Sequence, residues 1–215
     1  MKHIVITIVA VLLVGCWNKA ERALHTAAKQ GNIDSVRKAI DDGVNVDTVG
    51  YEGRTPLHEA AFAGHKDTVA FLISKGADVN VRDILCVTPM YWAAAGGHKD
   101  TVEFLASKGA DINARDGVIE AQSTGVVPLA NTRWTPLHIA SSQGRIAVVE
   151  FLISHGAEVN TTDNDDETPL DWTRIINEHD TVEDNERKAR NCPKIADLLR
   201  KHGGKSGEEL KAEGK

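Results

Sequence analysis

The chain has 215 residues, a length that corresponds to one or two ordinary domains. Asp and Glu (31) outnumber Lys and Arg (25), and the formal net charge of -6 argues against a general nucleic-acid binder, which needs a basic face. Hydrophobic residues make up 41% of the chain but aromatic residues only 5%, so we expect an aliphatic core such as stacked helices form. Three cysteines are too few for a disulfide scaffold.

The N-terminal segment has the layout of a secretory signal peptide. Lys2 supplies a positive charge, and residues 4–14 carry no charge at all. A helix of that length would span roughly 16 Å, about half of a ~30 Å hydrocarbon core, so it is too short for a permanent membrane span. A positive start, an apolar stretch and a small residue before the cut are the parts of a secretory signal.

The residues Leu13-Val14-Gly15-Cys16 resemble the lipobox of bacterial lipoproteins. In that family the Cys thiol is alkylated with a diacylglyceryl group, and a peptidase then cleaves before the Cys. The resemblance implies a signal peptide at 1–15 and lipidation of Cys16, with two or three acyl chains as a stable membrane anchor. Trp17 stands where Asp often marks inner-membrane retention, which favours the outer membrane in a double-membrane bacterium. The alternatives are an ordinary signal peptide or a buried apolar strand with a chance Gly-Cys pair.

A four-residue phrase repeats along the rest of the chain. It stands at Thr55-Pro56-Leu57-His58, Thr88-Pro89-Met90-Tyr91, Thr135-Pro136-Leu137-His138 and Thr168-Pro169-Leu170-Asp171. The intervals are 33, 47 and 33 residues, so the sequence indicates a 33-residue repeat with one insertion of 14 residues. Glycines keep the same register, since Gly31, Gly64 and Gly97 are also 33 residues apart. A fixed period of this length is typical of a solenoid.

Each unit predicts two short helices. Thr55 can cap a helix N-terminus, and Pro56 occupies the first turn, where no amide donor is needed. Leu57 and Ala60 begin a narrow apolar stripe, and Gly64 ends the helix in a left-handed conformation. A second helix with its own apolar stripe follows. One unit cannot bury these stripes alone, so its stability depends on its neighbours.

This pattern resembles the ankyrin repeat over about residues 20–205. The resemblance implies an all-α solenoid of about five helix-turn-helix repeats, each with a β-turn or hairpin that projects as a finger. The expected units are a signal peptide at 1–15, an N-terminal capping repeat at 20–49, repeats at 50–82, 83–115 and 116–162, a C-terminal capping repeat at 163–203, and a disordered tail at 204–215.

Two insertions interrupt the array. Residues 117–130 fall in the finger between repeats three and four, are half apolar and lack helical periodicity. They form either a partner-specific contact loop or a tolerated surface insertion. Residues 177–193 fall between the last two helices, with acidic residues before basic ones, an order that suits a helix. They form either a solvated helix extension or a docking element for a basic partner.

Ankyrin proteins usually contact partners through finger tips and the concave face of the first helices. Carried over by offset from each Thr-Pro pair, the candidate partner-binding positions are Tyr51, Glu52, Arg54, Phe62, Ile84, Leu85, Val87, Asn131, Thr132, Trp134, Gln143, Asn164, Asp165 and Glu167. Residues 84–87 are unusually apolar for an exposed tip, so they are either an interaction site or covered by the neighbouring insertion. The family's finger-turn glycine survives only as Gly53. Cys86, Arg133 and Asp166 replace it, which predicts altered or strained turns.

The remaining polar residues do not indicate catalysis. His25, His58 and His138 recur in phase, and the resemblance gives them hydrogen bonds within and between repeats, because helices ~8–10 Å apart do not bring them onto one metal ion. Cys86 and Cys192 are expected on different sides of the solenoid, too far apart for a disulfide. The sequence holds no nucleotide-binding Gly loop, metal-ligand spacing or catalytic set, so we expect no cofactor, no metal and no enzyme.

The sequence therefore predicts a membrane-anchored interaction module of a bacterial cell envelope. Its expected partners are another protein, whose identity the sequence does not give, and the membrane through Cys16, without nucleic acid. We expect a monomer. A periplasmic immunity or inhibitor protein against a toxin and a secreted host-directed effector are the alternatives, and the lipobox argues against the second.

Overall fold

The computed structural model describes residues 19–117, 132–174 and 181–214. These residues form helices and turns, with no strand among them. In chain order the elements are α2 (Lys19–Lys29), α3 (Ile33–Asp41), η1 (Tyr51–Gly53), α4 (Pro56–Phe62), α5 (Lys66–Ser74), α6 (Pro89–Gly96), α7 (Lys99–Ser107), α8 (Pro136–Ser142), α9 (Ile146–Ser154), η2 (Asp171–Arg174), α10 (Val182–Lys201) and α11 (Gly207–Ala212). The all-α fold class is confirmed.

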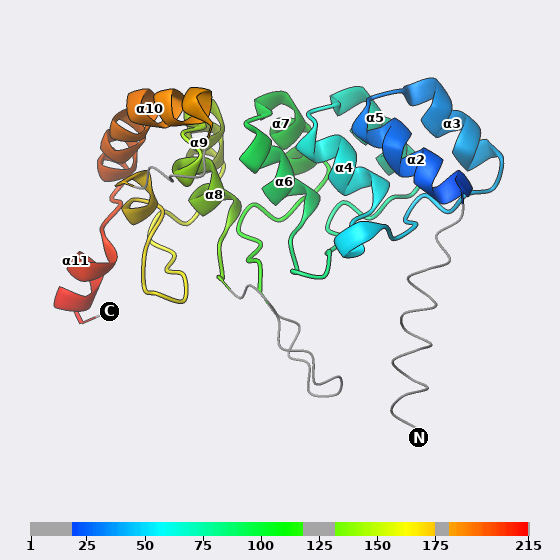
Figure 1. The fold of residues 1–215 in the computed structure, drawn as a ribbon. Coiled ribbons are helices and arrows are strands. Elements are labelled where there is room, and N and C mark those ends of the chain that lie inside the picture. The colour runs from blue at the N-terminus through cyan, green and yellow to red at the C-terminus, as the bar shows by residue number, and fades with distance from the viewer. Residues whose placement is uncertain (1–18, 118–131, 175–180, 215) are drawn as a thin grey trace, which may run out of the picture.

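The helices lie in two layers (Figure 1). The first helices of the repeats, α2, α4, α6 and α8, contact one another in order, and α3, α5, α7 and α9 form the second layer. Leu57, Met90 and Leu137 from the first layer are almost fully buried against Leu72 and Leu105 from the second. Burial of each such side chain contributes about 1.5–3 kcal/mol. The core is aliphatic and rich in alanine, as the composition predicted.

A threonine and a histidine together fix the start of two of the first helices, α4 and α8. The amide of Thr55 donates to Nδ1 of His58 (3.0 Å), and Nε2 of the same ring donates to the Val87 carbonyl in the next finger (3.1 Å). His138 makes the same cap with Thr135 (3.1 Å). Burial lowers the pKa of both imidazoles, that of His138 to about 4, so both rings are neutral at pH 7. A neutral ring can accept from one nitrogen and donate from the other, which this cap requires.

Asparagine side chains connect the repeats on the outer side of the second helices. The amide groups of Asn80, Asn113 and Asn160 donate to the carbonyl of the glycine that ends the next repeat's second helix (3.1, 3.2 and 3.0 Å). Their side-chain oxygens accept from a backbone amide two residues beyond that glycine (2.9, 3.0 and 2.8 Å). This Asn ladder ties each unit to its successor.

The first repeat has Asp47 at the position of the ladder asparagines. The amide of Asp78 hydrogen-bonds to this carboxylate, but one of its oxygens is buried with no partner among the described residues. A carboxylate cannot donate to Gly76, whose carbonyl corresponds to the acceptor in the other repeats. Partial burial raises the pKa of Asp47. The first rung of the ladder is therefore incomplete.

The last repeat ends differently from the sequence-based expectation. The prediction of a disordered tail at 204–215 is wrong for residues 204–214, because α11 packs back onto the array with Leu210 buried. Asp171, at the position of His58, Tyr91 and His138, accepts from the backbone amide of Gly207 (2.7 Å). The Thr168 hydroxyl donates to the Lys205 carbonyl (2.7 Å). The tail thus takes the place that the next repeat's finger would occupy.

The second insertion is mostly part of α10. Residues 177–180 lie outside the described part, and the remainder forms the N-terminal portion of this helix. The interpretation as a solvated extension is wrong in part. Val182 is 76% exposed, but Cys192 is buried, and the Asn191 side chain donates to the Gly144 carbonyl (2.9 Å). The extension therefore closes the repeat stack rather than projecting from it.

Asp47→Asn should stabilise the protein by about 1 kcal/mol, because the new amide can donate to the Gly76 carbonyl. The matched change Asn113→Asp should destabilise it by a similar amount. The folded state of the wild type holds the Asp47 proton more tightly than the unfolded state, so wild-type stability from this group rises as the pH falls. The difference in unfolding free energy between the Asp47→Asn variant and the wild type should therefore become smaller as the pH falls from 7 to about 4. Thermal unfolding at several pH values measures this, and an Asn variant no more stable than wild type at pH 7 would contradict the ladder.

Candidate functional site

The fingers form a row along one side of the two helix layers (Figure 1). Each finger is closed by a backbone hydrogen bond, for example from Asp83 N to Val87 O (3.1 Å) and from Asp163 N to Glu167 O (2.9 Å). Adjacent tips are also bonded, since Ile84 N donates to the carbonyl of Glu52 (3.1 Å) in the preceding finger. The pairs Gly117 to Leu85 (3.1 Å) and Asn164 to Thr132 (3.2 Å) repeat this contact.

These tip contacts locate the first insertion. The backbone amide of Gly117 donates to the preceding finger, as the amides of Ile84 and Asn164 do. The carbonyl of Thr132 accepts from the following finger, as the carbonyls of Glu52 and Leu85 do. Counted from these contacts, the 14 inserted positions are 118–131 in the sequence, one position later than the predicted range 117–130. Residues 118–131, with the candidate contact Asn131, lie outside the described part of the chain.

Left-handed residues shape every finger turn. At the second position before each Thr-Pro pair, φ is 73° for Gly53, 58° for Cys86, 59° for Arg133 and 60° for Asp166. The strained turns expected from the missing glycines are confirmed, because a side chain costs roughly 1–2 kcal/mol in this conformation. The turn keeps its shape despite this cost.

Buried aspartates hold the turns. Oδ1 of Asp83 accepts from the amides of Leu85 (2.9 Å) and Val87 (3.0 Å), and Asp163 binds two amides of its own finger in the same way (both 2.9 Å). The second oxygen of Asp83 accepts from the indole of Trp92 (3.1 Å). The second oxygen of Asp163 accepts from two indoles, that of Trp134 (3.2 Å) and that of Trp172 (2.8 Å). Finger turns and tryptophans are thus fixed by the same carboxylates.

An apolar cavity of about 190 Å³ opens between the third and fourth fingers, and we call it the finger groove. It is lined by Leu85, Val87, Tyr91, Trp92, Asp116, Thr132 and Trp134. Its two most polar groups bind each other, since the Thr132 hydroxyl donates to Asp116 (2.7 Å). Burial raises the pKa of Asp116. The walls thus present apolar and aromatic surface.

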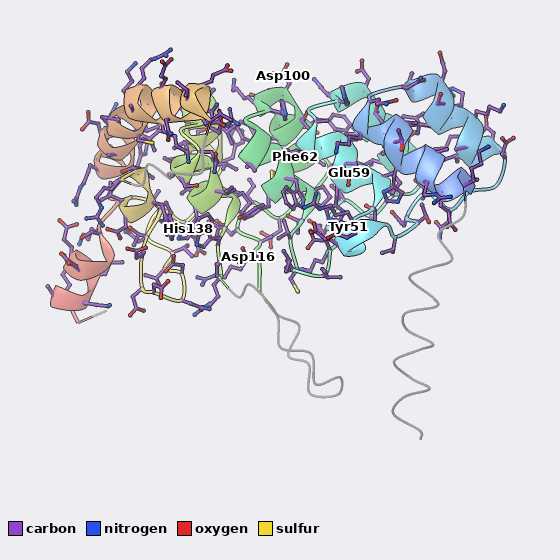
Figure 2. The ribbon with its side chains drawn as sticks, viewed as in Figure 1. Tyr51, Glu59, Phe62, Asp100, Asp116 and His138 are labelled. Carbon is purple, nitrogen blue, oxygen red and sulfur yellow. The ribbon has the colours of Figure 1, made fainter. Side chains whose placement is uncertain are left out.

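An aromatic cluster adjoins the finger groove on the side of the second repeat. The ring of Phe62 meets Trp92 edge-on with centroids 5.4 Å apart, and the guanidinium of Arg54 lies over Trp92 at 3.9 Å. Arg54 also pairs with Glu52 at 2.9 Å. Figure 2 shows Tyr51 on the finger side below Phe62, whereas Asp100 lies across the solenoid in the second layer.

The candidate contact positions fall into three groups. Tyr51, Phe62, Ile84, Asn164 and Asp165 are exposed, with Tyr51 at 78% and Ile84 at 64%. Glu52, Arg54, Leu85, Thr132, Trp134, Gln143 and Glu167 are half-buried. Of the apolar residues 84–87, Ile84 is exposed and Leu85 half-buried, whereas Cys86 and the candidate contact Val87 are buried.

Tyr91 and Trp92 line the finger groove but are not among the predicted contacts. The offsets carried over from the Thr-Pro pairs included the position of Phe62 on the first helix but not those of Tyr91 and Trp92. Two consecutive aromatic residues in a chain with 5% aromatic residues were the available signal.

Other kinds of site find little support in residues 19–117, 132–174 and 181–214. No three His, Cys, Asp or Glu side chains there are grouped to hold a metal ion, and no helix there has the length and apolarity to cross a bilayer. Cys86 and Cys192 are buried and unpaired, as expected. Burial raises the pKa of the Cys192 thiol, which disfavours the reactive thiolate.

Comparison with protein-family models agrees with this architecture. Residues 5–83 match a model described as ankyrin repeats in three copies, residues 87–117 match an ankyrin repeat, and residues 126–171 match ankyrin repeats in many copies. The chain belongs to the ankyrin-repeat family. A search of curated proteins found no match. Repeats of this family generally mediate binding to other proteins, so the chain is a protein-protein interaction module.

Proposed function

We propose that this protein is a non-catalytic binding module that a lipid anchor on Cys16 holds at a membrane of a bacterial envelope. The observation that supports the binding role most strongly is the finger groove, which is already formed in the free chain. Ile84, next to the lining residue Leu85, is an exposed apolar side chain, and Tyr51 is exposed on the preceding finger. A pocket with rigid aromatic walls and an apolar margin is the kind of surface where partners concentrate their binding energy.

The anchor would keep the array near the bilayer. Only Trp17 and Asn18 separate Cys16 from the start of α2 at Lys19. Even when fully extended, the chain from Cys16 to Lys19 spans at most about 11 Å. The N-terminal capping repeat would therefore face the membrane, and the row of fingers would run away from that end. A monomeric module placed in this way can bind an envelope protein without a further tether.

Cys16→Ser should move the full-length protein from the membrane fraction to the soluble fraction and abolish its labelling by a fatty-acid analogue, because the thiol is the acylated group. Cys192→Ser, which changes a buried thiol of α10, should remain labelled and membrane-bound. The extent of the first family match would also allow residues 5–15 to belong to the first repeat. In that case the Cys16→Ser protein would fractionate as the wild type does, which would overturn the anchor.

The binding role is tested in the membranes that contain the full-length protein. A photoreactive amino acid at Ile84, on the exposed third finger tip, should form an adduct with another protein on illumination. The same group at Asp100, on the second helix layer, should form none, because it lies away from the fingers (Figure 2). Equal adducts at both positions, or none at Ile84, would contradict binding through the finger side.

A further inference from the structure

The size of the finger groove limits what it can hold. Its volume of about 190 Å³ is below the ~300–1,000 Å³ of typical small-molecule pockets. It has room for one large side chain in contact with the lining residues Trp92 and Trp134. Both rings are held by indole hydrogen bonds to buried carboxylates, so the walls need little reorganisation when an occupant enters.

One hydrogen-bond donor in the finger groove has no acceptor in the described part of the chain. Tyr91 lines the cavity, and no described residue accepts a hydrogen bond from its hydroxyl. Burial and the nearby carboxylates of Asp116 and Asp83 raise its pKa, so the phenol stays protonated. A protonated phenol beside an apolar cavity can donate to a backbone carbonyl of an extended chain. This favours a peptide segment over a purely hydrocarbon occupant.

The charges beyond Trp134 favour a cation. Asp163, which holds the Trp134 indole, belongs to a finger that also carries Asp165 and Glu167. Within the described part of the chain neither Asp165 nor Glu167 forms an ion pair, and partial burial with the neighbouring carboxylates raises the pKa of Glu167, an effect that Arg174 partly offsets.

The nearby basic groups compensate only part of this charge, among them Arg115, which donates to the Thr162 carbonyl (3.2 Å). Arg174 pairs with Asp171, and Lys211 pairs with Asp166 at 2.9 Å. Arg133 is exposed at the fourth finger turn. A positive residue of a partner would find complementary charge next to the finger groove.

We propose that the finger groove docks an extended segment of a partner protein in which one large apolar side chain stands beside a basic residue. The apolar side chain fills the cavity lined by the two tryptophans. A backbone carbonyl next to it accepts from the Tyr91 hydroxyl, and the basic residue faces Asp165 and Glu167. This inference rests on the proposed function and specifies the chemistry of the partner.

The probe is a random peptide library displayed on phage, selected on the purified full-length protein in detergent. Selected peptides should share an apolar residue next to Lys or Arg. Leu85→Asp should weaken a selected peptide at least tenfold, because it places a charge in the cavity wall. The control Val182→Asp makes a similar change on the exposed surface of α10 and should leave binding unchanged. Circular dichroism should show the same helix content in both variants.

Two milder variants test the hydroxyl of Tyr91 and the carboxylates of the fifth finger separately. Tyr91→Phe removes one hydroxyl and should weaken binding about fivefold. Asp165→Asn together with Glu167→Gln should weaken it about threefold and reduce its salt dependence. Asp67→Asn together with Asp100→Asn, the same loss of two charges on exposed residues of the second helix layer, is the matched control and should leave binding unchanged.

The outcomes distinguish this inference from the proposed function. Selection of acidic or purely polar peptides, no enrichment at all, or binding that survives Leu85→Asp would each overturn the proposed partner chemistry. Photo-adducts at Ile84 in membranes would still support the binding module in those cases. Absence of adducts would instead count against the proposed function itself.

Discussion

Two buried aspartates organise the finger side of the solenoid. A buried carboxylate is stable only when donors fill its acceptor sites, and Asp83 and Asp163 are filled from two directions. Each takes two amides from its own finger turn and at least one tryptophan indole, that of Trp92 for Asp83 and those of Trp134 and Trp172 for Asp163. Turn shape and tryptophan orientation therefore cannot change independently.

This coupling explains how the fingers tolerate non-glycine residues in left-handed conformations. The amide bonds to the aspartate offset the cost of a positive φ at Cys86 and Asp166. Fixed turns also align the tip amides and carbonyls that join one finger to the next. The finger groove lined by Trp92 and Trp134 results from both contacts, so it is a property of stacked repeats rather than of any single unit.

Local signals in the sequence predicted most of the fold. The 33-residue spacing, the Thr-Pro pairs and the helix-ending glycines act within one or two turns of chain, and the structure has the expected helices at those places. Contacts between distant residues could not be predicted in this way. The docking of α11 depends on Asp171 meeting Gly207, and the burial of Val87 depends on the direction of a finger turn. Tyr91 and Trp92 became part of a site only through packing against the next finger.

The central claim is that the finger side is rigid before any partner binds, because the aspartates hold it. Native-state hydrogen exchange of the amides of Leu85, Val87, Asp165 and Glu167 measures this directly in the free protein. The structure predicts that these amides exchange about as slowly as those of the buried helices, although they lie in turns. Exchange at the rate of an unstructured chain would show that the fingers open freely, and would contradict a preformed finger groove.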